Sequence, residues 1–331
     1  MTRNGPPSTP VVVLAVGPVL VALTVAASLV GGATAWSPSV PSWALAVALV
    51  ALVLGVPHGA VDHLTLVGSS GTRTGALGRL LYVGTAAVAA LLVMLVPGPA
   101  FVVVLGMSVW HFGSGDVEAA ADLSGRARRP RAARVVLALA LGSAPVLLPL
   151  TGPSAVSTLR LIHPQLAVVL TPVVMSVTRY AVLCVIALAV TLLVRSGDRR
   201  GAGELVLLSV LGVVASPLVA FAVYFASWHA LRHTARLAAD PVGIVRPAAL
   251  ARTFAAGLPA LVVTIVVAAV CVLGFRGHAV LSTWLWVGLA LVWGLTVPHM
   301  VVVARFDRDR QVRSTFSIGR PLASSSTSLS R

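Results

Sequence analysis

Long apolar segments with almost no charged residues recur along most of this 331-residue chain. They cover residues 11–36, 43–66, 80–96, 100–110, 135–150, 166–194, 205–232, 254–273 and 281–303, and the 100–110 segment needs its continuation through Gly115. Most come close to the roughly 20 residues with which a helix crosses the hydrocarbon core of a bilayer. Helices satisfy their own backbone polar groups in lipid, and the segments lack the alternation typical of a membrane β-barrel. The sequence therefore predicts an all-α, polytopic membrane bundle.

The number of crossings depends on residues 204–240, where Ser216 and Pro217 interrupt the apolar run. Because a proline inside a helix kinks or breaks it, we expect two crossings here rather than one tilted helix. That division gives ten spans with both termini in the cytoplasm, and it places the arginine-rich connector 236–252 on the cytoplasmic side. The prediction is about eight to ten transmembrane helices.

Composition and charge support the same class of protein. The chain has 58% apolar residues, 10% charged residues and a mean hydropathy of +0.98. Its net charge of +15 comes from arginines that gather in short connectors. This is the positive-inside pattern of a multi-pass cell-membrane protein, and it argues against nucleic-acid binding. We expect a cytoplasmic segment at 1–10, one transmembrane catalytic domain at 11–304 and a basic, Ser-rich, disordered cytoplasmic tail at 305–331.

Histidines in the apolar segments are the strongest functional signal. Six of the eight lie in the strings PHGAVDH, WHFGSGD, WHALRH and VPHM, and five of these are the main candidates, namely His58, His111, His229, His233 and His299. Ionisable residues within membrane segments commonly mark a functional site. In the ten-span arrangement all four strings lie near the cytoplasmic end of their spans. The histidines could therefore meet at one depth, as a metal site between facing helices requires.

Two of these strings have spacing that suits a metal. His229 and His233 are four residues apart, so they project from one helical face and could chelate one ion. His58 and Asp62 have the same spacing, and the carboxylate could accept a hydrogen bond from the imidazole nitrogen turned away from the metal. In both cases the alternative is that the string lies at a helix end in the lipid headgroup region. His63, in the second string, would then also be exposed to water.

The other two strings are less specific. His111 precedes Gly113, Ser114 and Gly115, which we expect to loosen or end the helix and let Asp116 return toward His111. A plain helix end with Asp116 in water is the alternative. His299 has no acidic neighbour before Asp307, and a packing role explains it equally well. The remaining histidines, His163 and His278, lie in short connectors and are expected to be solvated.

Four imidazoles without thiolate partners suit a borderline divalent ion such as Fe(II), Zn(II) or Cu(II). Cys184 and Cys271 lie among aliphatic residues and are expected to be packing residues. A site inside the bundle would select an apolar substrate that arrives from the bilayer. Aromatic residues flank the histidines and could line an apolar tunnel or serve as interfacial anchors, namely Trp110, Phe112, Phe225 and Trp228.

The strings GVPHGAVDH, SVWHFGSGD and WHALRH, in this order, resemble the Brp/Blh family of β-carotene 15,15′-dioxygenases over roughly residues 51–299. The resemblance implies an integral-membrane, iron-dependent enzyme that splits β-carotene at its central double bond with O₂. The product would be two molecules of all-trans-retinal, commonly supplied to a rhodopsin. The family's iron-binding histidines would correspond to His58, His111, His229 and His233, which leaves His299 as an outer-shell or packing residue.

Other functions remain open at the level of sequence. A membrane iron desaturase or hydroxylase usually shows more HxxxH or HxxHH clusters than the single pair found here. A haem-binding electron carrier or a transporter could also use histidines on separate helices. Haem would give a visible Soret band, and a transporter would not consume carotene.

Overall fold

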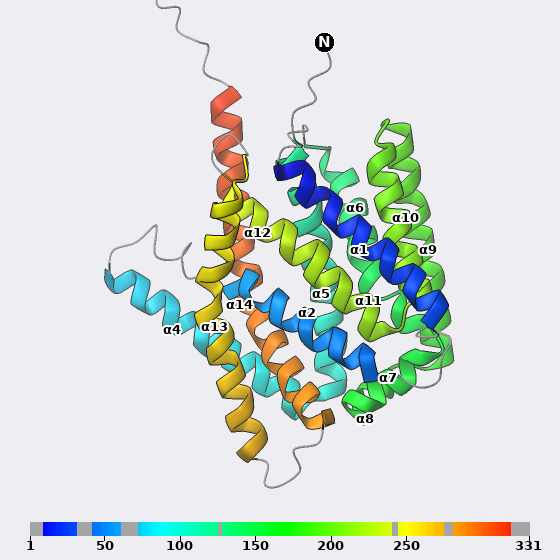
Figure 1. The fold of residues 1–331 in the computed structure, drawn as a ribbon, viewed down its shortest axis with the longest axis vertical. Helices are drawn as coiled ribbons and strands as arrows, with labels where there is room; N and C mark the ends of the chain where they lie inside the picture. Colours follow the sequence, from blue (N-terminus) through cyan, green and yellow to red (C-terminus); the bar gives the residue numbers. More distant parts are fainter. Residues whose placement is uncertain are drawn as a thin grey trace, which may run out of the picture.

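The computed structural model describes residues 9–31, 42–60, 72–124, 128–239, 244–274 and 281–318. Its longer helices are α1 (Thr9–Gly31), α2 (Ser42–Ala60), α4 (Thr72–Leu95), α5 (Pro97–Ser124), α6 (Arg131–Val146), α9 (Pro172–Arg195), α10 (Arg199–Val214), α13 (Pro247–Gly274) and α14 (Leu281–Ile318). Shorter pieces are η1 (Pro149–Thr151), α7 (Ser154–Ile162), α8 (Pro164–Ala167), α11 (Pro217–Val223), the π-helix η2 (Tyr224–Ala230) and α12 (Leu231–Ala238). Apart from isolated β-bridge residues, the described residues hold no β-structure, which confirms the all-α prediction (Figure 1).

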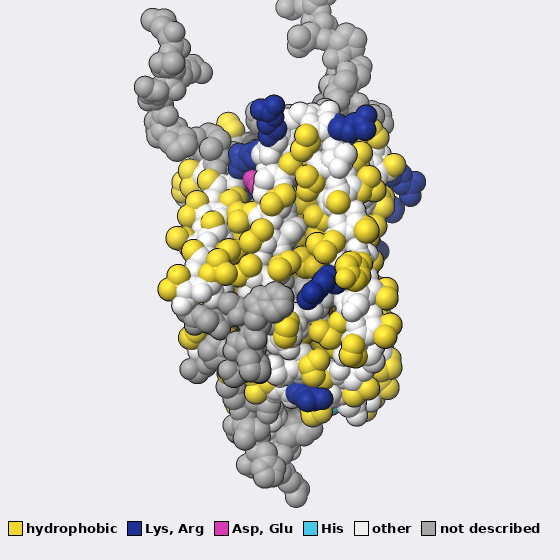
Figure 2. Space-filling view, turned by 90° about the vertical axis from the view of Figure 1, so that its right-hand side faces the viewer, with side chains coloured by type: hydrophobic (Ala, Val, Ile, Leu, Met, Phe, Trp, Pro, Cys, Tyr) yellow, Lys and Arg dark blue, Asp and Glu magenta, His cyan; other side chains and the backbone are white. Residues whose placement is uncertain are grey.

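Six helices in the described ranges are long and apolar enough to cross a membrane: α1, α4, α5, α9, α13 and α14. Helix α2 carries a shorter apolar stretch, Trp43–Gly59. Figure 2 shows one flank of the molecule covered largely by hydrophobic side chains, with arginines mainly toward its upper end. These features indicate a membrane protein, whereas the expected eight to ten crossings are not confirmed.

The break expected at Pro217 is present. Helix α10 ends at Val214, Ala215 and Ser216 are extended, and α11 begins at Pro217. Proline suits the first position of a helix, where its missing N–H has no helical partner to lose. Helices α11, η2 and α12 then continue without interruption from residue 217 to residue 238.

A proline also sets the start of α9. The apolar segment 166–194 does not form one helix, because the chain turns after α8 and α9 begins only at Pro172, capped by Thr171. The Thr171 hydroxyl accepts a hydrogen bond from the backbone N–H of Val174 at 3.2 Å. The helix therefore starts several residues later than the hydropathy of the segment suggested.

The expected break at Gly113–Gly115 is wrong, since α5 runs continuously from Pro97 to Ser124. The reason is helix packing. A Cβ on Gly113 would overlap the backbone of Ala138 in α6, and a Cβ on Gly142 of α6 would overlap the backbone of Val109. These glycines let α5 and α6 approach closely, so they serve packing rather than flexibility.

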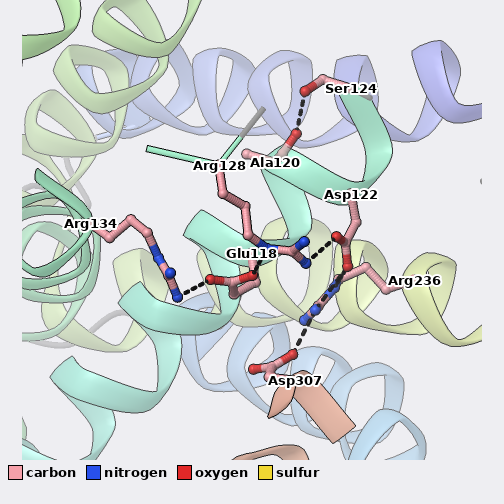
Figure 3. A network of polar contacts seen from close by, with 8 residues as sticks. All are labelled: Glu118, Ala120, Asp122, Ser124, Arg128, Arg134, Arg236 and Asp307. Carbon is pink, nitrogen blue, oxygen red and sulfur yellow. Dashed lines mark hydrogen bonds and ion pairs between the residues drawn. The ribbon is translucent and has the colours of Figure 1, made fainter. Parts of the chain in front are cut away.

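An ionic network fixes α5, α12 and α14 against one another (Figure 3). Arg236 of α12 is fully buried and contacts Asp122 of α5 at 3.0 Å and Asp307 of α14 at 2.6 Å. Arg128 joins Asp122 and Glu118, each at 2.9 Å. Arginines that lie far apart in the sequence therefore gather at one end of the bundle, as the charge pattern led us to expect.

Helix α14 continues beyond residue 304, where the tail was expected to begin, and ends at Ile318. Asp307 belongs to the ionic network, so this first part of the expected tail packs on the bundle. Residues 319–331 of the tail and residues 1–8 of the N-terminal segment lie outside the described ranges.

Candidate metal centre

Five histidines from four separate parts of the chain converge inside the bundle, and we call them the histidine cluster. They are His58 of α2, His111 of α5, His229 of η2, His233 of α12 and His299 of α14, with exposed fractions of 6%, 4%, 1%, 3% and 4%. The histidines of the four strings therefore meet at one place in the bundle. Because each histidine comes from a different helix or half-helix, folding of the whole bundle assembles the cluster.

Ring contacts link the cluster into a closed circuit. His111, His229, His233 and His299 follow one another around it, and their successive ring centroids are 5.1, 6.3, 5.6 and, back to His111, 4.9 Å apart. His58 contacts three members of this circuit, with its centroid 5.5 Å from His229, 5.6 Å from His233 and 5.3 Å from His299.

The nitrogens of the cluster suit a metal ion. One ligand nitrogen from each of His58, His111 and His229 lies within 4.8 Å of the other two. The Nε2 atoms of His58 and His229 and both ring nitrogens of His233 are buried and have no hydrogen-bond partner among the described residues. Each such buried polar atom costs about 1–3 kcal/mol, and binding to a cation removes that cost.

Hydrogen bonds fix the orientation of two imidazoles. Nδ1 of His58 is hydrogen-bonded to the carbonyl of Gly55 in the preceding turn of α2. Nδ1 of His229 lies 3.1 Å from Oδ1 of Asp116. In both rings the bonded Nδ1 leaves Nε2 as the ligand atom, which is the usual arrangement of a metal-binding histidine and its outer partner.

Asp116 itself is held by a third residue. It is 1% exposed, and its second oxygen accepts a hydrogen bond from the hydroxyl of Tyr224 at 2.8 Å. The structure thus places Asp116 next to the cluster, as the sequence suggested, although its partner is His229 rather than His111. The continuous α5 helix explains the difference, because it carries Asp116 forward instead of turning it back.

Local backbone features bring His229 into this position. It lies in the π-helix η2, a rare wider turn that often occurs at functional sites. The ring of His229 packs on Gly115, where an added Cβ would lie 3.0 Å from its Cε1 atom. His229 and His233 do share one helical face, since their rings stack on each other with centroids 6.3 Å and planes 13° apart.

Two of the four aromatic residues predicted to line a tunnel, Phe112 and Phe225, lie beside the histidine cluster. The ring of Phe112 lies 4.7 Å from that of His229, and the ring of Phe225 lies 5.3 Å from that of His58. Trp110 is 46% exposed on α5, which fits a lipid-facing residue rather than a cavity wall. Trp228 is fully buried, but it packs under the guanidinium of Arg232, 3.9 Å from the ring centroid.

Two cavities of opposite character lie beside the cluster. An apolar cavity of about 50 Å³ is lined by Phe225, by Ala48 and Ala51 of α2 and by aliphatic residues of α7, α11 and α14. A polar cavity of about 370 Å³ is lined by Asp116, Arg232 and charged residues of α5, α6 and α10. The cluster therefore has an apolar side at His58 and a polar side at His229.

Four other predicted or considered residues are not part of the described cluster. Asp62, His63 and His278 lie outside the described residues. His163 is remote from the cluster and partly buried rather than solvated, because its ring packs 4.6 Å from that of Trp286.

Comparison with known proteins identifies the family. A family profile described as beta-carotene 15,15'-dioxygenase matches residues 47–307. The chain belongs to the beta-carotene 15,15'-dioxygenase family. It is 30% identical over 304 residues to "Probable beta-carotene 15,15'-dioxygenase Blh" of Halobacterium salinarum, an alignment that covers 79% of this chain and 84% of the relative. No solved structure matches the chain.

Membership of the beta-carotene 15,15'-dioxygenase family agrees with the resemblance seen in the histidine strings. All the histidines in those strings that the structure describes belong to the cluster, and the matched region 47–307 contains every member. The family and the relative point to β-carotene as substrate and to dioxygenase activity.

Two residues that lie at the site, His299 and Tyr224, were not assigned to it from the sequence. His299 was set aside as a packing or outer-shell residue, yet its ring lies among those of His58, His111 and His233. Its only sequence signal was its place near the end of an apolar segment. Tyr224 gave no signal, because its partner Asp116 is 108 residues away in the chain.

Proposed function

We propose that this protein is an integral-membrane, iron-dependent β-carotene 15,15′-dioxygenase that converts one β-carotene and O₂ into two molecules of all-trans-retinal. The observation that carries the proposal is the convergence of buried histidines whose ligand nitrogens include several without hydrogen-bond partners. We assign His58, His111, His229 and His233 as iron ligands. The family match supplies the substrate and the class of reaction.

The donor set fits Fe(II). Imidazole suits several divalent ions, including iron, and the two cysteines lie outside the cluster, at exposed Cys184 and partly buried Cys271. Neutral imidazoles leave the charge of the ion uncompensated in a medium of low dielectric constant. The carboxylate of Asp116 offsets part of that charge through its hydrogen bond to His229.

The surroundings of the cluster suit an apolar polyene. Phe225 contacts His58 and also lines the apolar cavity, so one aromatic ring stands between this cavity and His58. Because the polyene comes from lipid rather than from water, close packing of its atoms against the protein would supply most of the binding energy. We assign this side of the cluster to the central part of the polyene.

The chemistry of the reaction agrees with the side chains present. Cleavage breaks both bonds of the central C=C, and each carbon receives one oxygen atom of O₂, so two aldehydes form without any other reductant or net proton transfer. Bound Fe(II) supplies the redox chemistry that lets O₂ react with the double bond. The protein side chains hold the ion, position the polyene and exclude water, with Phe112 and Phe225 closing the site around His229 and His58.

We place the enzyme in the cell membrane, where carotenoids dissolve. Retinal is also lipid-soluble and would leave through the bilayer, where a retinal-binding rhodopsin could take it up. The arginine-rich end of the bundle would face the cytoplasm under the positive-inside rule.

Expression in a carotene-accumulating bacterium tests the function. Cells that produce the wild-type protein should lose their orange colour, and chromatography should show retinal. His229→Ala should abolish both the iron content and the cleavage, whereas the control His163→Ala, outside the cluster, should retain both. Well-expressed, iron-replete protein that yields no retinal would contradict the proposal.

A further inference from the structure

We propose that His299 is a fifth iron ligand, so that five imidazoles rather than four hold the ion. This inference rests on the proposed function, because it extends the ligand set of the same site. It assigns a direct role to a residue that its sequence context left as a packing or outer-shell residue.

The ring contacts carry the first part of the argument. His299 closes the circuit between His111, at 4.9 Å, and His233, at 5.6 Å. Its contact with His111 is the shortest between any two rings of the cluster. An outer-shell histidine would stand behind a ligand and hydrogen-bond to it, whereas His299 stands beside three ligands at once.

The helices fix His299 in this place. Two turns further along α14, Asp307 contacts Arg236, which itself follows His233 by one turn of α12. The ion pair therefore holds α14 in register with α12, which carries His233 and continues directly from the π-helix that carries His229. On the opposite side, an added Cβ on Gly59 of α2 would already lie 3.4 Å from Nδ1 of His299, so α2 packs directly on the ring.

The burial of His299 agrees with a ligand role. Its exposed fraction of 4% equals that of His111 and lies within the range of the other members. Five imidazole ligands would leave one fewer position on the ion open to O₂ than four would. The proposal therefore also limits how O₂ can approach the ion.

Removal of His299 tests the proposal in purified protein. Loss of an outer-shell partner weakens metal binding about 10–100-fold, so loss of a ligand should weaken Fe(II) binding by more than about 100-fold. His299→Ala should show this loss, and added imidazole should restore part of the affinity by filling the vacated position. His163→Ala is the matched control and should bind Fe(II) like the wild type, since its ring packs on Trp286 outside the cluster.

A second measurement does not depend on the folding of a variant. In wild-type protein loaded with Co(II), each ligating imidazole contributes one paramagnetically shifted N–H signal to the proton NMR spectrum. Five signals are expected in the wild type and four in His299→Ala. Four signals in the wild type, or unchanged metal affinity in a folded variant, would overturn the proposal. Failure of the wild type to bind Fe(II) or to release retinal would instead contradict the proposed function.

Discussion

Single residues decide which nitrogen faces the cluster in two of its imidazoles, His58 and His229. Nδ1 of His58 bonds to the Gly55 carbonyl, and Nδ1 of His229 bonds to Asp116, so Nε2 is the ligand atom in both. Tyr224 occupies the other oxygen of Asp116 and limits its rotation. A chain of two hydrogen bonds therefore orients His229 before any ion binds.

Loss of the Tyr224 hydroxyl should weaken this orientation. We expect Tyr224→Phe to bind Fe(II) about 10-fold more weakly, at the low end of the range for outer-shell partners, because Asp116 keeps its contact with His229. Metal titration of the purified apoprotein measures the change. Tyr180→Phe is the control, since Tyr180 is 68% exposed on α9. Equal affinities for the two variants would show that the hydroxyl has no positioning role.

Residue types in the sequence predicted much of the site, but spatial partners were harder to predict. His58, His111, His229 and His233 were identifiable because imidazoles in apolar helices are rare and two of them have helical spacing. Asp116 was found through its closeness to His111 in sequence, although its contact is with His229. His299 and Tyr224 depend on contacts between distant helices, and no local pattern encodes those contacts.

At the level of helices, glycines and buried charges hold the site together. Gly113 and Gly142 allow close packing of α5 on α6, and Arg236 joins α12 to α5 and α14. The break before Pro217 was predictable, because proline acts on its own backbone. The continuity of α5 was not, because a glycine that permits close packing looks the same in sequence as one that ends a helix.

The packing role of Gly113 can be measured against another glycine of the same helix. Gly113→Ala would force the new methyl group into the backbone of Ala138, and overpacking of this kind costs about 1–3 kcal/mol. Gly106→Ala is the control, because an added Cβ there meets nothing within 4 Å and alanine favours the helix by up to about 1 kcal/mol. Unfolding in detergent should show the first variant destabilised and the second unchanged or stabilised. Equal stability of the two would remove the packing explanation for a continuous α5.

Loss of the buried ion pairs of Arg236 should lower the stability of the protein more than the substitution at Gly113. Arg236→Ala would leave Asp122 and Asp307 without this partner, and breaking a buried pair costs about 3–5 kcal/mol. Arg252→Ala, at an exposed position of α13, should change stability by less than about 0.5 kcal/mol. The difference in the free energy of unfolding between the two variants measures the contribution of the network. A similar small change in both would contradict its proposed role in fixing α12 against α14.

At the scale of the whole molecule, the histidine cluster has a polar side and an apolar side. The polar cavity reaches Asp116, and the apolar cavity reaches Phe225 beside His58. Hydropathy predicted the membrane class, while the six helices that meet the length and hydropathy of a span are fewer than the eight to ten crossings expected. Helices α6 and α10, with 16 residues each, and α12, with 8, are shorter than the roughly 20 residues of a membrane-spanning helix.

Filling the apolar cavity should separate substrate binding from metal binding. Ala51→Leu adds three carbon atoms to the cavity wall, so we expect β-carotene cleavage to fall at least about 10-fold, a barrier increase of about 1.4 kcal/mol, while the iron content stays unchanged. Ala87→Leu, at an exposed position of α4, is the control and should retain both properties. Loss of iron from Ala51→Leu would show instead that the cavity wall supports the ligands.

The most direct test of the iron-dependent cleavage is the stoichiometry of the purified protein. Apoprotein reconstituted with Fe(II) and supplied with β-carotene and O₂ should form two molecules of retinal for each β-carotene consumed, and the apoprotein should form none. Retinal from metal-free protein, or carotene loss without retinal from the iron-loaded protein, would contradict the assignment of the histidine cluster as the catalytic iron site.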